Sequence, residues 1–518
     1  MRKLLWLALI GNCFAQIPCP SNETLNLPPD GPSAAPKACI NTSLPVTKSA
    51  VAISLLSTLP ATLKCGTTVS LKPGKYGSVT LPKCSAGNWL ILKSSGKVPA
   101  PGQRFVPGMG YQTAVFDHIT AGSYNRLGPG IEVLQAVEGG YDSTLLDARN
   151  DSHVELIRGW IHGTATGEVG HAIIANGSDH IAVSGNTISE IHCKAGSTGK
   201  CSDAQGFLAG CGASGVGFLI ENNYIEASTE GILFGGCGAT TSATDAIVRR
   251  NHIVKPLRWM QGQPDFVGIR FTVKNCFEAK NVQRLLFEDN ICENSWGGFS
   301  QDGYPVLLTS KNQTGQAPNA QVSDVIVRFN HLIGGSGIQF AAAKDTPPPA
   351  NASSFGTLDA SIHDNLIEVD PKFIDSRGLD LQLTLQDDSP SAKFTNINVS
   401  NNTWTGATNA ALMLGGHVAG SLTISKNIFF NGKFGSVVNS SNPGDCGANL
   451  NTKALQALTA CWPNFTFTGN VVVGGTSALW PSGTSVPTLS PLNPDFSSLI
   501  PGVGADIPAL NLALAGVN

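Results

Sequence analysis

The residues best suited to chemistry in this sequence lie close together in one short segment. Within residues 271–281, Lys274, Glu278 and Lys280 occur at even spacings, so in an extended strand their side chains share one face. Two ammonium groups and a carboxylate on one face could hold an anionic sugar. β-Elimination of a uronate needs a cation that neutralises the sugar carboxylate and a base that removes the adjacent carbon-bound proton. We therefore expect Lys274 or Lys280 to be that base, with a solvated charged strand face as the alternative explanation.

Polar residues recur at the same place in neighbouring segments of the chain. Each segment aligns on an apolar residue that we expect to face a core, and a polar residue lies two positions before it. These polar residues are His171, Gln205, Glu230, Asn275, Tyr304 and Ser336. If the segments stack, the polar residues form one line of side chains. In the elimination hypothesis His171 or Tyr304 is the proton donor, and Gln205 and Asn275 bind the substrate.

A long insertion, 257–266, lies next to this candidate face. Trp259 within it could stack on a sugar ring, and Arg258 beside it is a candidate for contact with the same substrate. Tryptophans in loops are also packing anchors about as often. The sequence leaves both roles open.

Two other functions fit the same residues. Hydrolysis of a glycosidic bond needs two carboxylates roughly 5–10 Å apart. Asp203 and Glu230 lie in neighbouring segments and could meet that distance. A rod without catalytic activity, used as a surface adhesin or a glycan-binding scaffold, is the other possibility, because fold does not decide function. We rank hydrolysis below elimination.

The elements that must position these residues follow from a repeat. Short apolar segments end again and again in asparagine, at Asn186, Asn223, Asn251, Asn290, Asn330, Asn365, Asn402, Asn427 and Asn470. Three and five residues before the asparagine, and two residues after it, no segment carries a charge. This pattern indicates a strand, a turn and a second strand, and asparagine suits the turn because it tolerates the left-handed conformation. Successive asparagines lie 25 to 43 residues apart, which is typical of solenoid coils with outer loops of variable length.

The repeats predict an all-β fold, a parallel β-helix of roughly ten or more coils that advance by about 4.8 Å each. Stacked asparagines can also bond to one another from coil to coil. Residues two positions before the asparagine alternate in charge, which we interpret as a structural ion-pair ladder. They are Glu221, Arg249, Glu288, Arg328 and His363.

The repeats resemble those of secreted right-handed parallel β-helix proteins of the pectin-lyase-like superfamily, in particular a largely uncharacterised bacterial branch. The resemblance is carried by residues 65–84, 89–95, 218–236, 247–259, 271–296, 305–313 and 502–518. It implies a carbohydrate-active protein, since characterised members are mostly polysaccharide lyases, hydrolases and epimerases, and some are non-catalytic. Calcium-dependent members hold Ca²⁺ with carboxylates from adjacent coils beside a lysine. The resemblance therefore points to Glu230 and Glu278 as Ca²⁺ ligands, although the single glutamate between Lys274 and Lys280 departs from that pattern.

The ends and composition of the chain indicate its setting. Of 518 residues, 33 are basic and 36 acidic, which excludes an electrostatic nucleic-acid binder. Residues 1–15 have the basic start, apolar run and small final residue of a secretory signal, and no later stretch is apolar enough for a membrane span. We expect a secreted protein, extracellular or periplasmic, that acts on a polysaccharide as a monomer.

We divide the mature chain into an N-terminal segment and cap (16–64, with a helix in 46–59), a β-helix (65–480) and a C-terminal tail (481–518) that packs along the rod or caps its last coil. Twelve cysteines remain after the signal, an even number that is compatible with disulfides. Plausible pairs are Cys19/Cys39, Cys65/Cys84, Cys193/Cys201, Cys211/Cys237 and Cys446/Cys461. The connectivity stays open at this point.

Overall fold

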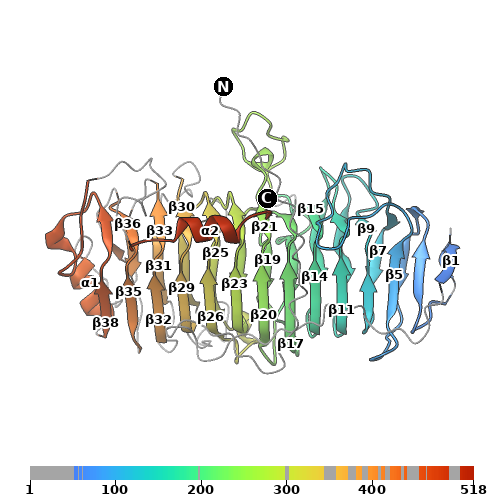
Figure 1. Ribbon diagram of the computed structural model, residues 1–518, viewed down its shortest axis with the longest axis horizontal. Coiled ribbons are helices and arrows are strands. Elements are labelled where there is room, and N and C mark those ends of the chain that lie inside the picture. Colours follow the sequence, from blue (N-terminus) through green and yellow to red (C-terminus); the bar gives the residue numbers. More distant parts are fainter. Residues whose placement is uncertain are drawn as a thin grey trace.

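The computed structural model describes residues 52–488 and 502–517, except for 57, 61, 197–198, 298–302, 344–356, 371–380, 388–394, 407–409, 415–419, 433–436, 440–453 and 463. The predicted signal, 1–15, lies outside these residues. In the described part the chain winds into a right-handed parallel β-helix, and its strands stand side by side along the rod (Figure 1). Each coil contributes one strand to each of three long parallel sheets, which we number in the order the chain visits them.

Sheet 1 precedes the asparagine turn. Its strands are β1 (Ala52–Leu56), β2 (Thr68–Leu71), β5 (Leu90–Ser94), β8 (Asn125–Leu127), β11 (Ser152–Ile157), β14 (Asp179–Ser184), β17 (Val216–Glu221), β20 (Ala243–Arg249), β23 (Val282–Glu288), β26 (Val322–Arg328), β29 (Thr357–His363), β32 (Thr395–Ser400), β35 (Leu422–Ser425) and β38 (Phe465–Thr468).

Sheet 2 follows that turn. Its strands are β3 (Gly74–Lys75), β6 (Ala114–Phe116), β9 (Ile131–Leu134), β12 (Trp160–His162), β15 (Thr187–Ile191), β18 (Tyr224–Ala227), β21 (His252–Val254), β24 (Ile291–Glu293), β27 (His331–Ile333), β30 (Leu366–Glu368), β33 (Thr403–Thr405), β36 (Ile428–Phe430) and β39 (Val471–Val473).

Sheet 3 closes each coil. Its strands are β4 (Ser78–Thr80), β7 (His118–Thr120), β10 (Tyr141–Asp147), β13 (Glu168–Ile174), β16 (Gln205–Ala209), β19 (Ile232–Phe234), β22 (Phe277–Ala279), β25 (Val306–Lys311), β28 (Ile338–Ala343), β31 (Leu381–Asp387), β34 (Ala410–Leu414) and β37 (Val437–Asn439). The helices of the described residues are α1 (Ala454–Cys461), α2 (Ile507–Ala513) and the short 3-10 turns η1 (Leu257–Trp259), η2 (Gln313–Gly315) and η4 (Ser477–Leu479). None of these has the length and apolar character of a membrane span.

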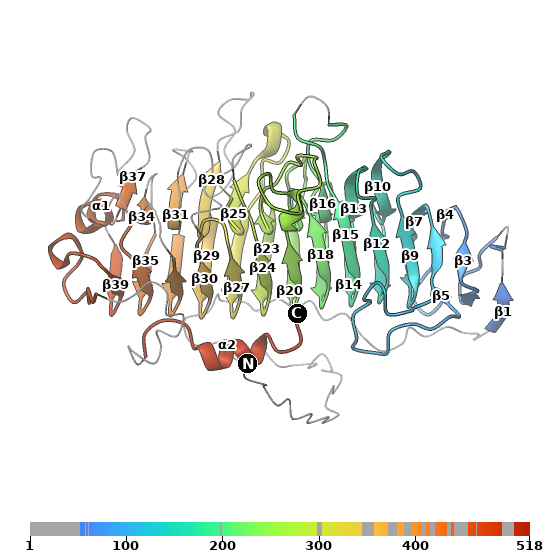
Figure 2. The same ribbon diagram turned by 90° about the horizontal axis from the view of Figure 1, so that it is seen from above.

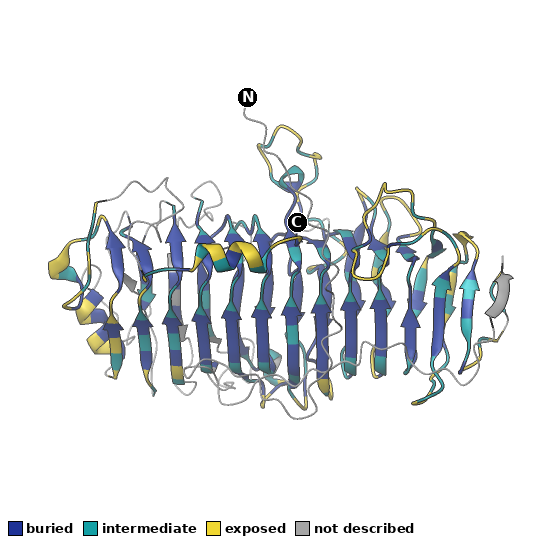
Figure 3. Cartoon of the chain, viewed as in Figure 1, coloured by how far each residue is buried: buried dark blue, intermediate teal, exposed yellow. Residues whose placement is uncertain are grey.

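The strand register predicted from the repeat is confirmed. Ile220 of β17 pairs with Val183 of β14 on one side and with Val248 of β20 on the other, all from the column three residues before the asparagine. These side chains are almost completely buried, and one continuous core of such columns fills the rod (Figure 3). Alternation with a period of two sends the same columns inward in each coil.

The asparagine turns form a hydrogen-bonded ladder. The Oδ1 of Asn223 accepts from the backbone N–H of Asn186 at 2.9 Å and from its Nδ2 at 3.0 Å, and Asn223 in turn donates to Asn251. The same pattern continues coil by coil to Asn470. The ion-pair ladder is also present: Arg249 pairs with Glu221 and Arg328 with Glu288, each at 2.8 Å. Both ladders therefore have structural roles.

The first described strand corrects one expectation. A helix within 46–59 is wrong for Ala52–Leu56, which form β1 and pair in parallel with β2. The open edge of the first coil offers unpaired backbone groups, and an extended apolar run can satisfy them where a helix cannot.

Residues 502–517 run along the outside of the rod. Asp506 caps α2 by accepting from the backbone N–H of Ala509 at 2.9 Å. Upstream of the helix, the N–H of Gly504 donates to the carbonyl of Lys426 at 2.7 Å. At the end of the helix, Arg250 donates to the carbonyl of Ala513 at 2.8 Å, and downstream to that of Ala515 at 2.7 Å. Figure 1 shows α2 lying across the strands in the middle of the rod.

Disulfides tie several coils internally. The predicted pairs Cys65–Cys84, Cys193–Cys201 and Cys211–Cys237 are confirmed. A further disulfide, Cys276–Cys292, joins the start of a sheet 3 strand to β24 through the core. The predicted pairs Cys19/Cys39 and Cys446/Cys461 involve residues outside the described ranges.

Candidate functional site

Seven polar side chains gather along β13, β16, β19 and β22 and the residues next to these strands, and we call them the charged cluster. Its members are His171, Asp203, Gln205, Glu230, Lys274, Glu278 and Lys280. His171 pairs in register with Gln205, and Glu278 pairs with Leu233 of the preceding coil. The repeat thus brings together residues more than 100 positions apart, as the sequence pattern predicts.

Two glycines fix the approach to these strands. A Cβ on Gly206 would lie 2.6 Å from the carbonyl oxygen of Gly231 and from Ile225, and a Cβ on Gly231 would lie 2.3 Å from Ile253. Only glycine therefore lets the chain pass this close to sheet 2. Gln205 and Glu230 directly precede these glycines, so they arrive at equivalent places in consecutive coils.

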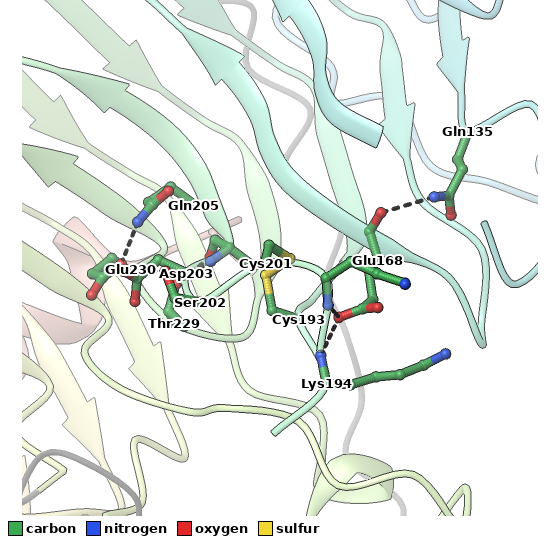
Figure 4. Close-up of a disulfide and its surroundings, with 12 residues drawn as sticks. Gln135, Glu168, Cys193, Lys194, Cys201, Ser202, Asp203, Gln205, Thr229 and Glu230 are labelled. Carbon is green, nitrogen blue, oxygen red and sulfur yellow. Dashed lines mark hydrogen bonds between the residues drawn. A yellow bond between two sulfur atoms is a disulfide. The ribbon is translucent and has the colours of Figure 1, made fainter. Parts of the chain in front are cut away.

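A chain of contacts runs through Glu230. The Nε2 of Gln205 donates to its Oε2 at 2.8 Å (Figure 4). The Nζ of Lys274 lies 3.6 Å from its Oε1. Lys274 also forms an ion pair with Asp203. The side chain of Glu230 is 2% exposed, whereas that of Asp203 is 38% exposed. Lys274 therefore connects a buried carboxylate to a carboxylate at the surface.

Glu278 and Lys280 form a second ion pair, 3.0 Å long, in which Glu278 is almost completely buried. Burial raises the pKa of Glu278 more than the attraction of Lys280 lowers it. For Lys280 the balance is opposite: burial lowers its pKa, but Glu278 and Glu230 outweigh burial and raise it. Lys274 behaves alike, with Glu230 and Asp203 raising its pKa. Because a base at neutral pH needs a pKa near 7, these contacts disfavour either lysine as the base.

His171 has the opposite electrostatic environment. Burial lowers its pKa more than Gln205, Asp203 and Glu230 raise it. Its imidazole is therefore neutral at neutral pH. A neutral imidazole is a general base, whereas we expected His171 to be a proton donor.

Four buried polar atoms of this region have no hydrogen-bond partner among the described residues. They are Nδ1 of His171, Oε1 of Gln205, Oδ1 of Asn275 and Oε2 of Glu278. Buried polar atoms in folded proteins are nearly always paired, so four of them in the three coils of β13, β16 and β22 require an explanation. A hydroxyl-rich ligand can satisfy such atoms.

Asn275 and Tyr304 occupy the next two coils but lie deeper. The Nδ2 of Asn275 donates to the backbone carbonyl of Tyr304 at 2.8 Å, and Tyr304 is 2% exposed. This burial disfavours Tyr304 as a proton donor to a bound substrate.

Lys255 is a functional candidate that the sequence analysis missed. It is completely buried, and its Nζ donates to the carbonyl oxygens of Ala227 and, at 2.8 Å, of Thr229. Burial lowers its pKa to about 7, against the attraction of Glu230. Lys255 thus holds the turn that leads into Glu230. The available signal was a lysine directly after the apolar strand β21.

Trp259 and Arg258 anchor the insertion to the rod. Trp259 is 1% exposed and packs edge-on against His192 and Phe271. Arg258 donates to Glu190 at 2.7 Å and to Glu226 at 2.9 Å. The burial of Trp259 and the two ion pairs of Arg258 disfavour the contacts with a substrate that the sequence predicts for them.

The donor set around Glu230 and Glu278 does not fit Ca²⁺. Lys274 and Lys280 already neutralise these carboxylates, and a hard cation would have to displace both ammonium groups. In the described residues, metal-like spacing occurs instead at His153, Asp179 and His180 of sheet 1. There the two imidazoles stack in parallel, 4.3 Å apart and 7° from coplanar, so their in-plane lone pairs do not converge on one ion.

Comparisons with known proteins add little to this description. No protein-family model and no curated protein matches the chain. A GH87 α-1,3-glucanase catalytic domain is 11% identical over 82% of this chain and 70% of its own, with a TM-score of 0.45. PfbA, a surface adhesin of Streptococcus pneumoniae, is 10% identical over 77% and 84%, with a TM-score of 0.40. A PL6 polysaccharide lyase from Pseudopedobacter saltans is 11% identical over 88% and 92%, with a TM-score of 0.34.

Similarities of this size say nothing about activity. The class of protein is defined by the chain's own strand pairing. It is a right-handed parallel β-helix with three parallel sheets and an asparagine ladder.

Proposed function

We propose that this protein is a secreted carbohydrate-active β-helix protein that binds an acidic polysaccharide at the charged cluster and cleaves it by β-elimination. The observation that carries the proposal is the group of four unpaired buried polar atoms beside two lysines. Sugar hydroxyls can form hydrogen bonds with these atoms, and the lysines can bind the carboxylate of a uronate. Four disulfides among the described residues support an oxidising, extracytoplasmic setting.

Asp203 indicates where the substrate carboxylate binds. It is the exposed partner of Lys274, while the other side of Lys274 faces buried Glu230. A uronate carboxylate can therefore replace Asp203 on the ammonium at little cost. This exchange would place the sugar over Gln205 and His171.

In the proposed reaction Lys274 neutralises the uronate carboxylate, which makes the C5 proton acidic. His171 takes that proton, and the electron pair of the C–H bond forms the C4–C5 double bond. The C4–O bond breaks, and the leaving oxygen takes a proton from solvent water. Glu278 stays in its buried ion pair with Lys280.

The test is an assay of unsaturated product by ultraviolet absorbance on pectate, alginate and glycosaminoglycans, with and without EDTA. We expect turnover on one of these substrates that EDTA leaves unchanged. His171→Ala should reduce kcat by roughly 10²–10⁴-fold. Lys72→Ala, at an exposed site, is the matched control. The absence of unsaturated product from all substrates would refute elimination.

Hydrolysis is the second candidate, because Asp203 and Glu230 contact the same ammonium. Two carboxylates bridged in this way lie on the order of 6 Å apart, within the range of glycosidase pairs. Asp203→Asn separates the two chemistries. If Asp203 only holds the place of a uronate, this variant binds substrate more tightly and keeps its turnover. If Asp203 is a catalytic carboxylate, new reducing ends no longer form.

A non-catalytic glycan-binding rod remains the alternative of a different class. Its signature is saturable polysaccharide binding, measured by calorimetry, without unsaturated product or new reducing ends. His171→Ala would then change affinity alone.

A further inference from the structure

Two segments meet beside the charged cluster and form what we call the rim: residues 190–196 with 199–203, and residues 255–275, which include the insertion 257–266. Lys194 and Phe271 form an antiparallel bridge. The N–H of Ala195 donates to the carbonyl of Arg270 at 2.8 Å, and that of Thr272 to the carbonyl of Cys193 at 3.0 Å. The two loops are therefore joined through their backbones.

The first loop is closed at its base. Cys193–Cys201 links its two ends, and buried Glu168 accepts the backbone N–H groups of Lys194 and Lys200, each at 2.9 Å (Figure 4). One carboxylate that binds both amides holds these two lysines as neighbours. In Figure 4 the side chain of Lys194 extends away from the disulfide.

The rim carries more basic than acidic residues, whereas the whole chain carries slightly more acidic than basic ones. Apart from the completely buried Lys255, these two segments hold five basic and three acidic residues, whereas the whole chain has 33 basic and 36 acidic. Glu190 is paired with Arg258, and Asp203 with Lys274. Lys200 and Arg270 are exposed, and neither Lys194 nor Lys200 forms an ion pair with a described residue. Cations collected on one rim of a weakly acidic protein attract a polyanion.

We propose that Lys194, Lys200 and Arg270 form a second subsite, which holds the acidic polysaccharide beyond the sugar bound at the charged cluster. This second subsite extends the proposed function, and it rests on that function for the orientation of the polysaccharide. The bridge sets Lys194 opposite Phe271, so Lys194 is a diagonal neighbour of Arg270 on the joined backbones. Lys274 lies four residues beyond Arg270 in the same segment. An anionic chain that binds Lys274 can therefore continue along the rim by charge complementarity.

The test measures affinity for pectate, alginate and heparin oligosaccharides of graded length. The triple variant Lys194→Gln, Lys200→Gln, Arg270→Gln is compared with a matched triple variant at the exposed Lys64, Lys72 and Lys75. We expect the rim variant to bind long oligosaccharides about 10-fold more weakly at low salt, with a shallower salt dependence. The control variant should match wild type. Equal affinity and salt dependence in wild type and the rim variant would overturn the subsite.

Short oligosaccharides separate this subsite from the proposed reaction. A dimer or trimer fills the charged cluster without reaching the rim, so the rim variant should bind and process it as wild type does. If wild type binds long polyanions through the rim but yields no cleavage product, the proposed reaction fails and the subsite stands. If cleavage occurs with the same KM in the rim variant on long chains, the subsite fails and the reaction stands.

Discussion

At the residue scale, burial decides which groups at the cluster carry protons. Lys274 and Lys280 face carboxylates that raise their pKa, whereas desolvation of the half-buried His171 lowers its pKa. On an exposed strand face, the same residue types would have kept pKa values close to the ordinary ones. The sequence suggests a lysine as the base and His171 as the proton donor. In the proposed reaction His171 is instead the base.

The pH dependence of activity follows from His171. As the base it must be neutral, and burial shifts its pKa below the ordinary 6.5. We expect kcat/KM to rise with pH through an apparent pKa below 6.5 and to remain high at neutral pH. A lysine base would instead delay the rise until pH values near or above 10. Measuring kcat/KM from acid to alkaline pH distinguishes the two.

Lys255 gives a prediction about stability. Its pKa falls from 10.5 in the unfolded chain to about 7 in the fold. Between these values the unfolded state binds more protons, so the contribution of Lys255 to stability is present above pH 10.5 and is lost as pH falls toward 7. We expect the free energy of unfolding of wild type, relative to Lys255→Met, to rise across this window. Urea unfolding at several pH values measures it, and a parallel pH dependence of the two proteins would contradict the assignment.

At the element scale, the coils are joined by ladders that repeat one interaction. Each asparagine side chain bonds to the next coil and to a strand carbonyl, so the turns of sheets 1 and 2 form one continuous network. A loop such as the insertion has no equivalent in neighbouring coils and depends on single anchors such as Arg258.

The ladder predicts the cost of removing one rung. Asn290→Ala leaves two donors of Asn251 and one buried carbonyl unpaired, which should lower the free energy of unfolding by about 2–4 kcal/mol. Asn319→Ala, at an exposed loop position, should change it by less than about 0.5 kcal/mol. Denaturant unfolding checks both, and equal effects would mean that the ladder is energetically neutral.

At the scale of the whole molecule, the C-terminal segment connects distant parts of the rod. Arg104 donates to the carbonyl of Val517 at 2.7 Å, Arg250 contacts the end of α2, and Gly504 bonds to Lys426. The segment therefore joins Lys426, close to the C-terminal end of the rod, to Arg250 in the middle coils and to a loop from an N-terminal coil. We infer that this segment resists separation of the coils.

Two leucines of α2 test that role. Leu510 is 1% exposed, and Leu512 is 78% exposed. Leu510→Ala should destabilise the rod by about 2–3 kcal/mol, whereas Leu512→Ala should have almost no effect. Thermal unfolding followed by circular dichroism measures both. If Leu510→Ala left the Tm unchanged, the segment would be a passive tail.

The sequence by itself determined the rod. Strand register, the core columns, the asparagine ladder and the Glu221–Arg249 ion pair all depend on side-chain direction along a strand, which alternates with a fixed period that can be read directly. The same stacking predicted that His171, Gln205 and Glu230 lie in adjacent coils. Only the tertiary structure decided that Trp259 is buried and that Lys255 supports the turn before Glu230. It also decided that Asp203 reaches Lys274 and that Cys276 pairs with Cys292. These contacts are made by loops that do not repeat from coil to coil, so no periodic pattern predicts them. The protonation of a charged group depends on how completely such loops exclude water from it, and no local sequence pattern encodes that exclusion.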